Sequence, residues 1–318
     1  MKIDMPVAEL FDYQGQNPRP EDFDVYWEQA LAELDCTRHN VELIPAEFAC
    51  PSVDCFDLWY TGVHDARIHA KYVRPKNIEN PIPAIFFFHG YTMSSPGWYD
   101  LLPFGASGMA VAAMDCRGQG GLSEDSGRVK GTTFKGHIIR GLDDSPDKLL
   151  FRQVFLDTVQ LVRSVTSFSE IDENRLGCCG ASQGGALTMV CAALETRIKR
   201  AAPIYPFLCD YKRVWEMDLA KNAYLEITDY FRRHDPRHER ENEIFTKLGY
   251  IDIQFLAPRI KAEVLMQTGL MDEVCPPSSQ FAAYNKITSK KKVLLYPDFA
   301  HEEAPGHWDI VLNFLAAL

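Results

Sequence analysis

The run Gly180-Ala-Ser-Gln-Gly184 carries the residue types of a serine nucleophile held in a sharp turn. It lies between an apolar run and a helical pattern. Glycines without a Cβ let a strand turn directly into a helix, so that Ser182 projects from the turn. The N-terminus of the following helix also favours negative charge that develops nearby. Such a run also occurs in ordinary turns, but the strand–turn–helix context favours a nucleophile.

A serine attacks at neutral pH only with a neighbouring base, which a third group orients. Where the nucleophile lies on this kind of turn, an acid and then a histidine follow it in the chain, on loops after later strands. Asp272 follows the apolar run 264–267, and His301 follows the run 293–296. We therefore expect Ser182, Asp272 and His301 to form a catalytic triad.

Other carboxylates compete with Asp272 for the role of the acid. Glu273 is its neighbour, and Asp298 lies on the same loop as His301. Asp298 is so close to His301 in the chain that a side-on approach to the Nδ1 atom is awkward, and Glu302 has the same difficulty. His301 alone could be a surface loop residue. The order of the three elements is what favours the triad.

The oxyanion that forms during acyl transfer needs two N–H donors. One is expected from the backbone of Gln183, the residue after the nucleophile. The other is expected from the loop after the first buried parallel strand, His89-Gly-Tyr-Thr, where we choose the backbone N–H of Tyr91. His89 itself precedes the nucleophile in the chain and is interpreted as a structural loop residue.

The run Asp115-Cys-Arg-Gly-Gln-Gly-Gly contains the glycines of a dinucleotide loop but fails at its last glycine, so we expect no cofactor. Arg117 at a strand end is interpreted as an anchor that fixes neighbouring loops by bidentate hydrogen bonds. His234 and His238 have the spacing of metal ligands on one helix face. A third ligand is not evident, so a solvated charged segment is favoured and no metal site is expected.

Short apolar runs separated by helical patterns predict parallel strands buried on both faces of a sheet. Alternating runs near 56–62 and 67–73 predict antiparallel strands, and 21–35 predicts an amphipathic helix. The fold class expected is therefore α/β, an α/β-hydrolase fold with a mostly parallel central sheet flanked by helices. The expected parallel strands are 84–88, 109–114, 176–179, 264–267 and 293–296, and the expected crossover helices are 148–164, 186–194, 276–287 and 307–318.

The pattern along the chain suggests a single domain, 1–318, with an N-terminal extension over 1–55. Residues 120–147 and 207–255 do not fit a minimal α/β unit. We interpret both stretches as insertions over the carboxyl ends of the strands, where open α/β sheets bind ligands.

Composition excludes several functions. The net charge of −11 argues against nucleic-acid binding, which requires a basic surface. The longest apolar run, 82–88, is too short to span a bilayer, and the first residues do not resemble a signal peptide. Nine cysteines, an odd number scattered along the chain, are typical of free thiols in a reducing compartment, so a cytoplasmic location is expected.

In these motifs the chain resembles the acetyl xylan esterase and cephalosporin C deacetylase family, carbohydrate esterase family 7. The resemblance extends from Asp22-Phe-Asp-Val-Tyr-Trp to the last helix and is far more specific than G-x-S-x-G alone. The motifs that carry it are Arg117-Gly118-Gln119, Gly180-Ala-Ser-Gln-Gly, His301-Glu302, Lys135-Gly-His-Ile-Ile-Arg-Gly and Asp272-Glu-Val-Cys-Pro-Pro-Ser.

The resemblance implies the triad Ser182, Asp272 and His301, with the N–H groups of Tyr91 and Gln183 as the oxyanion hole. It also implies deacetylation of small acetylated sugars, xylo-oligosaccharides and cephalosporin C-type esters, in a homo-hexamer built as a trimer of dimers. A peptidase or lactone hydrolase with the same triad is one alternative. A catalytically silent binding protein that keeps the fold is another.

Overall fold

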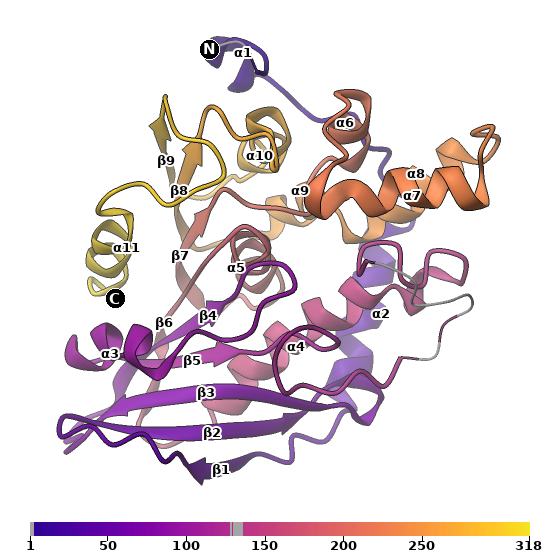
Figure 1. The fold of residues 1–318 in the computed structure, drawn as a ribbon. Coiled ribbons are helices and arrows are strands. Elements are labelled where there is room, and N and C mark those ends of the chain that lie inside the picture. The colour runs from indigo at the N-terminus through magenta and orange to yellow at the C-terminus, as the bar shows by residue number, and fades with distance from the viewer. Residues whose placement is uncertain (1–2, 128, 130–135) are drawn as a thin grey trace.

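The computed structural model describes residues 3–127, 129 and 136–318 (Figure 1). Within these residues, one sheet has the strand order β1-β2-β3-β5-β4-β6-β7-β8-β9. The first three strands and their junction with β5 are antiparallel, and the remaining pairs are parallel. The strands are β1 Glu42–Pro45, β2 Val53–Thr61, β3 Arg67–Pro75, β4 Ile82–Phe88, β5 Ala110–Met114, β6 Ile171–Ala181, β7 Ile198–Ile204, β8 Glu263–Gly269 and β9 Lys291–Tyr296.

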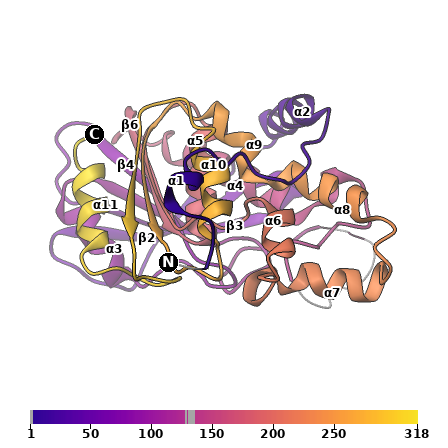
Figure 2. The same ribbon diagram turned by 90° about the horizontal axis from the view of Figure 1, so that it is seen from above.

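Helices cover both faces of this sheet (Figures 1 and 2). Helices α3 and α11 pack on one face with their own apolar cluster, and α2, α4, α5 and α10 belong to a larger cluster on the other face. The α-helices are α1 Val7–Leu10, α2 Phe23–Asp35, α3 Trp98–Ala106, α4 Leu150–Val165, α5 Gln183–Leu194, α6 Tyr211–Glu216, α7 Leu225–His234, α8 Glu241–Leu248, α9 Ile253–Leu256, α10 Pro277–Tyr284 and α11 His307–Leu315. The 3-10 turns are η1 Val63–Asp65, η2 Pro146–Lys148, η3 Asn222–Tyr224, η4 Gly249–Ile251 and η5 Ala257–Arg259.

Strand β4 lies between β5 and β6, so the chain reverses its direction of travel across the sheet at this point. Its apolar side chains and those of β5 are almost all buried, as expected for strands covered on both faces. Open sheets of this kind bind ligands at the carboxyl ends of the strands that flank such a reversal. The loops after β4, β5 and β6 therefore enclose the favoured place for a site.

The predicted strands and helices are present, and the mostly parallel sheet flanked by helices is confirmed. Strand β7 was not predicted, because Lys199, Arg200 and Pro203 interrupt its apolar pattern. The expectation that the run 293–296 is buried on both faces was wrong. This run belongs to β9, which lies at the edge of the sheet, and its side chains are only half-buried.

The segments outside the expected α/β unit pack closely against it. Helix α1 lies beside α10, where the rings of Phe11 and Phe281 meet edge to face at 5.0 Å. The stretch 207–255 forms α6 to α9 and contributes fully buried side chains such as Tyr211 and Tyr224. Residues 128 and 130–135 of the expected insertion 120–147, Lys135 included, lie outside the described residues. The division into one domain, an extension and two insertions stays a prediction.

Two further findings concern the chain as a whole. In the described part of the chain, we find no helix long and apolar enough to cross a membrane. All nine cysteines fall within the described residues, and each is a free thiol.

Candidate active site

Ser182 lies at the junction between β6 and α5, in a backbone conformation that L-residues rarely adopt. Its φ is 58° and its ψ is −117°. Its N–H donates to the carbonyl of Ile204 at 2.9 Å, and its carbonyl accepts from the N–H of Phe207 at 3.0 Å. These bonds to the end of β7 and to Phe207 just after it hold the turn in its strained shape.

The two glycines of the motif are required by close approach of the backbone. A Cβ at Gly184 would lie 1.9 Å from the carbonyl oxygen of Phe88, and one at Gly180 would lie 2.4 Å from the same atom. Either contact is far shorter than van der Waals distance. The end of β4 and the turn after β6 therefore pack together only because both positions lack a side chain.

The structure brings the three residues of the expected triad into one hydrogen-bonded line. His301 Nε2 lies 3.0 Å from Ser182 Oγ, and His301 Nδ1 lies 2.8 Å from Asp272 Oδ2. Asp272 is fully buried, and its second oxygen accepts the N–H groups of Val274 and Cys275, each at 2.8 Å. The carboxylate is thus fixed in orientation. The arrangement allows a histidine to remove a proton from the serine while the carboxylate holds the ring.

The competing carboxylates lie elsewhere. Glu273 and Asp298 are exposed to solvent, while Asp272 occupies the Nδ1 side of His301. Glu302 is also exposed, and its carboxylate accepts the N–H of Ala300 at 3.1 Å. Glu302 therefore shapes the loop that carries His301.

The expected oxyanion donors lie on two loops that Gln119 joins. Gln119 Oε1 accepts the N–H of Thr92 at 2.9 Å, next to Tyr91. Its Nε2 donates to Gln183 Oε1 at 2.8 Å, and Gln183 Nε2 donates back at 3.1 Å. Gln119 therefore fixes the loop after β4 relative to the start of α5, and this gives a physical reason for a glutamine in the Arg117-Gly118-Gln119 motif. Gly118 contributes a positive φ of 69° to the turn.

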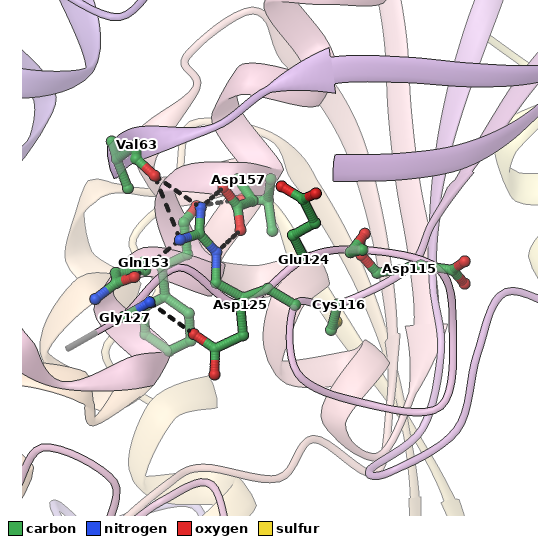
Figure 3. A network of polar contacts seen from close by, with 12 residues as sticks. Val63, Asp115, Cys116, Glu124, Asp125, Gly127, Gln153 and Asp157 are labelled. Carbon is green, nitrogen blue, oxygen red and sulfur yellow. Dashed lines mark hydrogen bonds and ion pairs between the residues drawn. The ribbon is translucent and has the colours of Figure 1, made fainter. Parts of the chain in front are cut away.

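Arg117 is completely buried and makes a bidentate pair with Asp157 of α4. The Nε–Oδ2 and Nη2–Oδ1 distances are both 2.6 Å, and Nη1 donates to Gln153 Oε1 at 2.8 Å. Figure 3 shows Asp157, Gln153 and the Val63 carbonyl turned toward this guanidinium. Burial opposes the charge, yet the Asp157 carboxylate raises the pKa of Arg117 above its ordinary value. The anchor thus ties the loop after β5 mainly to a helix, whereas neighbouring loops were expected.

Sequence reasoning missed a second buried cluster, around Asp115. Its carboxylate accepts the N–H of Ser95 at 2.6 Å and that of Leu122 at 3.0 Å, and it lies 2.7 Å from His69 Nδ1. The other ring nitrogen of His69 lies 2.9 Å from Asp57. Burial disfavours the His69 cation, but the two carboxylates raise its pKa. The position of Asp115 directly after a buried strand was the available signal.

Glu226 of α7 is another residue that sequence reasoning missed. Its carboxylate accepts the phenol O–H of Tyr91 and the N–H of Ile139, the latter at 3.0 Å. The N–H of His137 donates to the Tyr91 oxygen at 2.9 Å. Burial raises the pKa of Glu226 to about 7, although these hydrogen bonds oppose the shift. Glu226 therefore joins 207–255 and 136–139 to the loop that carries Tyr91.

The histidines with metal-ligand spacing pack on aromatic rings. His234 lies against Tyr230 at 5.0 Å, and His238 lies against Phe231 at 4.5 Å. Among the described residues, the group with metal-ligating atoms close together is Asp272, Cys275 and His301. This group includes two of the three residues of the expected triad.

The family model described as acetyl xylan esterase (AXE1) matches residues 1–318. The structure of acetyl xylan esterase 1 from Thermoanaerobacterium sp. JW/SL YS485 is 56% identical, with a TM-score of 0.97 and 99% of each chain covered. That of an acetyl xylan esterase from Paenibacillus sp. R4 is 36% identical, with a TM-score of 0.94, over 98% of this chain and 99% of the other.

A curated relative is longer than this chain. The acetyl esterase Axe7A of Xylanibacter ruminicola is 26% identical over 302 residues, which are 89% of this chain and 63% of that protein. The chain thus spans less than two thirds of its length. A solved α/β hydrolase that is only 15% identical superposes with a TM-score of 0.58, which shows a shared fold alone. The α/β-hydrolase fold is confirmed.

Proposed function

Because the chain belongs to the acetyl xylan esterase (AXE1) family, we propose that it is a serine hydrolase that removes acetyl groups from small acetylated sugars and xylo-oligosaccharides. The observation that carries the proposal is the line from Ser182 Oγ through the His301 ring to the buried Asp272 carboxylate, at a strained turn. Glycines in contact with Phe88 allow this turn.

In the proposed mechanism, Ser182 Oγ attacks the acetyl carbonyl while His301 Nε2 takes its proton. The backbone N–H groups of Tyr91 and Gln183 donate to the oxyanion. Hydrogen bonds from Gln119 fix the positions of the two segments that carry these groups. The sugar alkoxide then leaves with the proton from His301. Water, activated by the same nitrogen, hydrolyses the acetyl-enzyme, and Asp272 orients the ring and stabilises its charged form in both steps.

We extend the proposal to features that rest on the family resemblance. Cephalosporin C-type acetyl esters are a second substrate class, and a homo-hexamer, a trimer of dimers, is the proposed assembly. A cytoplasmic location is also proposed, and the free thiols of all nine cysteines support it. Acetate release from cephalosporin C and the mass of the assembly in solution test the first two.

The main experiment measures acetate release from acetylated xylose, xylo-oligosaccharides and cephalosporin C. Ser182→Ala is expected to lower kcat by at least about 10⁴-fold, because the nucleophile is lost while binding remains. Labelling by a fluorophosphonate is expected to disappear in the same variant. Ser107→Ala, an exposed serine at the end of α3, is the matched control and is expected to behave as the parent.

The alternative activities make opposite predictions. Faster turnover of dipeptidyl substrates or lactones than of acetylated sugars would overturn the deacetylase proposal and leave the nucleophile in place. An unlabelled, inactive protein with an intact fold would favour a silent binding protein. A preference for short acyl groups is part of the proposal, and comparable turnover of acetyl and octanoyl nitrophenyl esters would contradict it.

A further inference from the structure

Cys275 lies beside the triad, and the mechanism does not use it. It follows Asp272 by three residues on the loop between β8 and α10, and its side chain is completely buried. Its N–H donates to the Asp272 carboxylate at 2.8 Å. Three atoms that could bind a metal, one each from Asp272, Cys275 and His301, lie within 4.8 Å of one another.

A carboxylate, a thiol and an imidazole that converge in this way form a donor set for borderline-soft divalent cations. Donor atoms around tetrahedral zinc are about 3.3–3.8 Å apart, given metal–ligand distances of about 2.0–2.3 Å. The longest distance within the group therefore needs to shorten by at most about 1.5 Å. We propose that Asp272, Cys275 and His301 bind Zn²⁺ or Cd²⁺ as a reversible inhibitory site.

The charges around the thiol favour this ligand. Burial, followed by the Asp272 carboxylate, raises the pKa of the Cys275 thiol well above its ordinary value, although Ser182 opposes the shift. The thiol is therefore neutral in the free protein. A divalent cation supplies the missing positive charge, so the metal–sulfur bond forms as the S–H bond breaks and one proton leaves to solvent.

Other groups that face this site do not supply that charge. The phenols of Tyr205 and Tyr224 lie near Cys275, and burial raises the pKa of both, so they stay neutral below pH 9. Glu302 and Glu303 act electrostatically on Tyr205 and add only negative charge. His301 also faces this site, and it belongs to the proposed donor set.

The bound cation would stop ester hydrolysis. It engages a ring nitrogen of His301 and the Asp272 carboxylate, so the ring no longer accepts the Ser182 proton. The inhibition is expected to be reversed by a chelator. The inhibition rests on the proposed function, whereas cation binding is measured without substrate, so a failure of one is distinguished from a failure of the other.

The test titrates the intact protein with Cd²⁺, without thiol reductants, and follows the ultraviolet charge-transfer absorption of the cadmium–thiolate bond. One equivalent is expected to saturate the absorption and abolish hydrolysis of an acetyl nitrophenyl ester, and a chelator is expected to restore activity. In Cys275→Ala the absorption is expected to vanish. The inhibition constant, measured against the variant's own metal-free rate, is expected to rise at least about 100-fold.

Two controls and a pH series complete the design. Cys275→Ser guards against a packing defect in the alanine variant, and Cys36→Ser and Cys50→Ser remove more accessible thiols and are expected to keep full sensitivity. The inhibition constant is expected to be about tenfold lower at pH 8 than at pH 7, because one thiol proton is released. Unchanged inhibition in both Cys275 variants, or absorption at one equivalent without inhibition, would overturn the proposal.

Discussion

Two carboxylates lie buried near the candidate site, Asp157 behind the loop after β5 and Glu226 behind the loop after β4. Asp157 is 0% exposed and Glu226 is 3% exposed. Asp157 receives a bidentate guanidinium from Arg117, whereas Glu226 receives a phenol O–H and a backbone N–H. The charge of Asp157 is therefore balanced by a cation, whereas the hydrogen-bond donors to Glu226 are all neutral.

The presence or absence of a cationic partner gives these two buried carboxylates different roles. The Arg117–Asp157 pair is fully buried, and its charges balance each other, as expected for a structural anchor. Glu226 has no full counter-charge among its hydrogen-bond partners, and burial raises its pKa to about 7. Its protonation state therefore changes near neutral pH, beside the loop that carries a proposed oxyanion donor.

The largest effect is expected when the balanced pair is broken. Asp157→Ala leaves the Arg117 charge buried without a carboxylate to balance it, which costs about 3–5 kcal/mol. The free energy of unfolding from urea titration measures this loss. Replacing both residues by leucine is expected to recover much of the loss, since the unpaired charge is then removed. A loss below about 1 kcal/mol in Asp157→Ala would show that the anchor is not structural.

Glu226→Gln tests the unbalanced acid. The folded-state pKa of about 7 lies above the ordinary 4.5, so the folded protein holds this proton more tightly than the unfolded chain. Stability is therefore lost as pH rises from about 4.5 through about 7, by about 3 kcal/mol. The variant is expected to lack this slope. Unfolding free energies of both proteins at pH 5, 6, 7 and 8 measure it, and parallel curves would contradict the assignment.

Tyr91→Phe tests the environment of Glu226 by removing one of its hydrogen-bond donors. The variant keeps the ring contacts with Phe207 and His137 but removes the O–H that donates to Glu226. A loss of about 1–3 kcal/mol is expected for the unsatisfied buried partner. The hydrogen bond from Tyr91 lowers the pKa of Glu226, so its removal is expected to move the pH-dependent loss to higher pH. An unchanged midpoint in the pH series would argue against the coupling.

The smallest effect is expected at an exposed pair. Arg19 and Asp24 lie 2.6 Å apart, but their side chains are 40% and 58% exposed. Water and salt screen such pairs, so Arg19→Ala is expected to cost about 0–1 kcal/mol, less in high salt. The same urea titration gives the baseline against which the two buried acids are judged.

Much of the fold could be predicted from the sequence because apolar runs of strand length mark buried parallel strands. The run 110–114 is an example, since each of its residues is buried. Strand β7 escaped because Lys199 and Arg200 sit within it, where the strand begins near the surface. The exposure of β9 could not be predicted either, since an edge position depends on strand order, which periodicity does not report.

In the candidate site, too, some residues could be predicted from the sequence and others could not. The proximity of Ser182, Asp272 and His301 could be predicted, because the order of the strand-end loops restricts which residues meet. Glu226 was not found, because it lies in a stretch rich in charged residues whose neighbours are mostly solvated. Asp157 likewise looks like one polar residue of an amphipathic helix, and only the packing of α4 shows that it is buried.

The half-buried edge strand β9 also affects the order in which regions of the protein unfold. His301 follows β9, and its partners Ser182 and Asp272 lie 119 and 29 positions away in the chain. An edge strand with few covered side chains opens at lower free energy than the centre of a sheet. On heating, the histidine is expected to leave the serine while β4 to β7 remain folded, so inactivation precedes global unfolding.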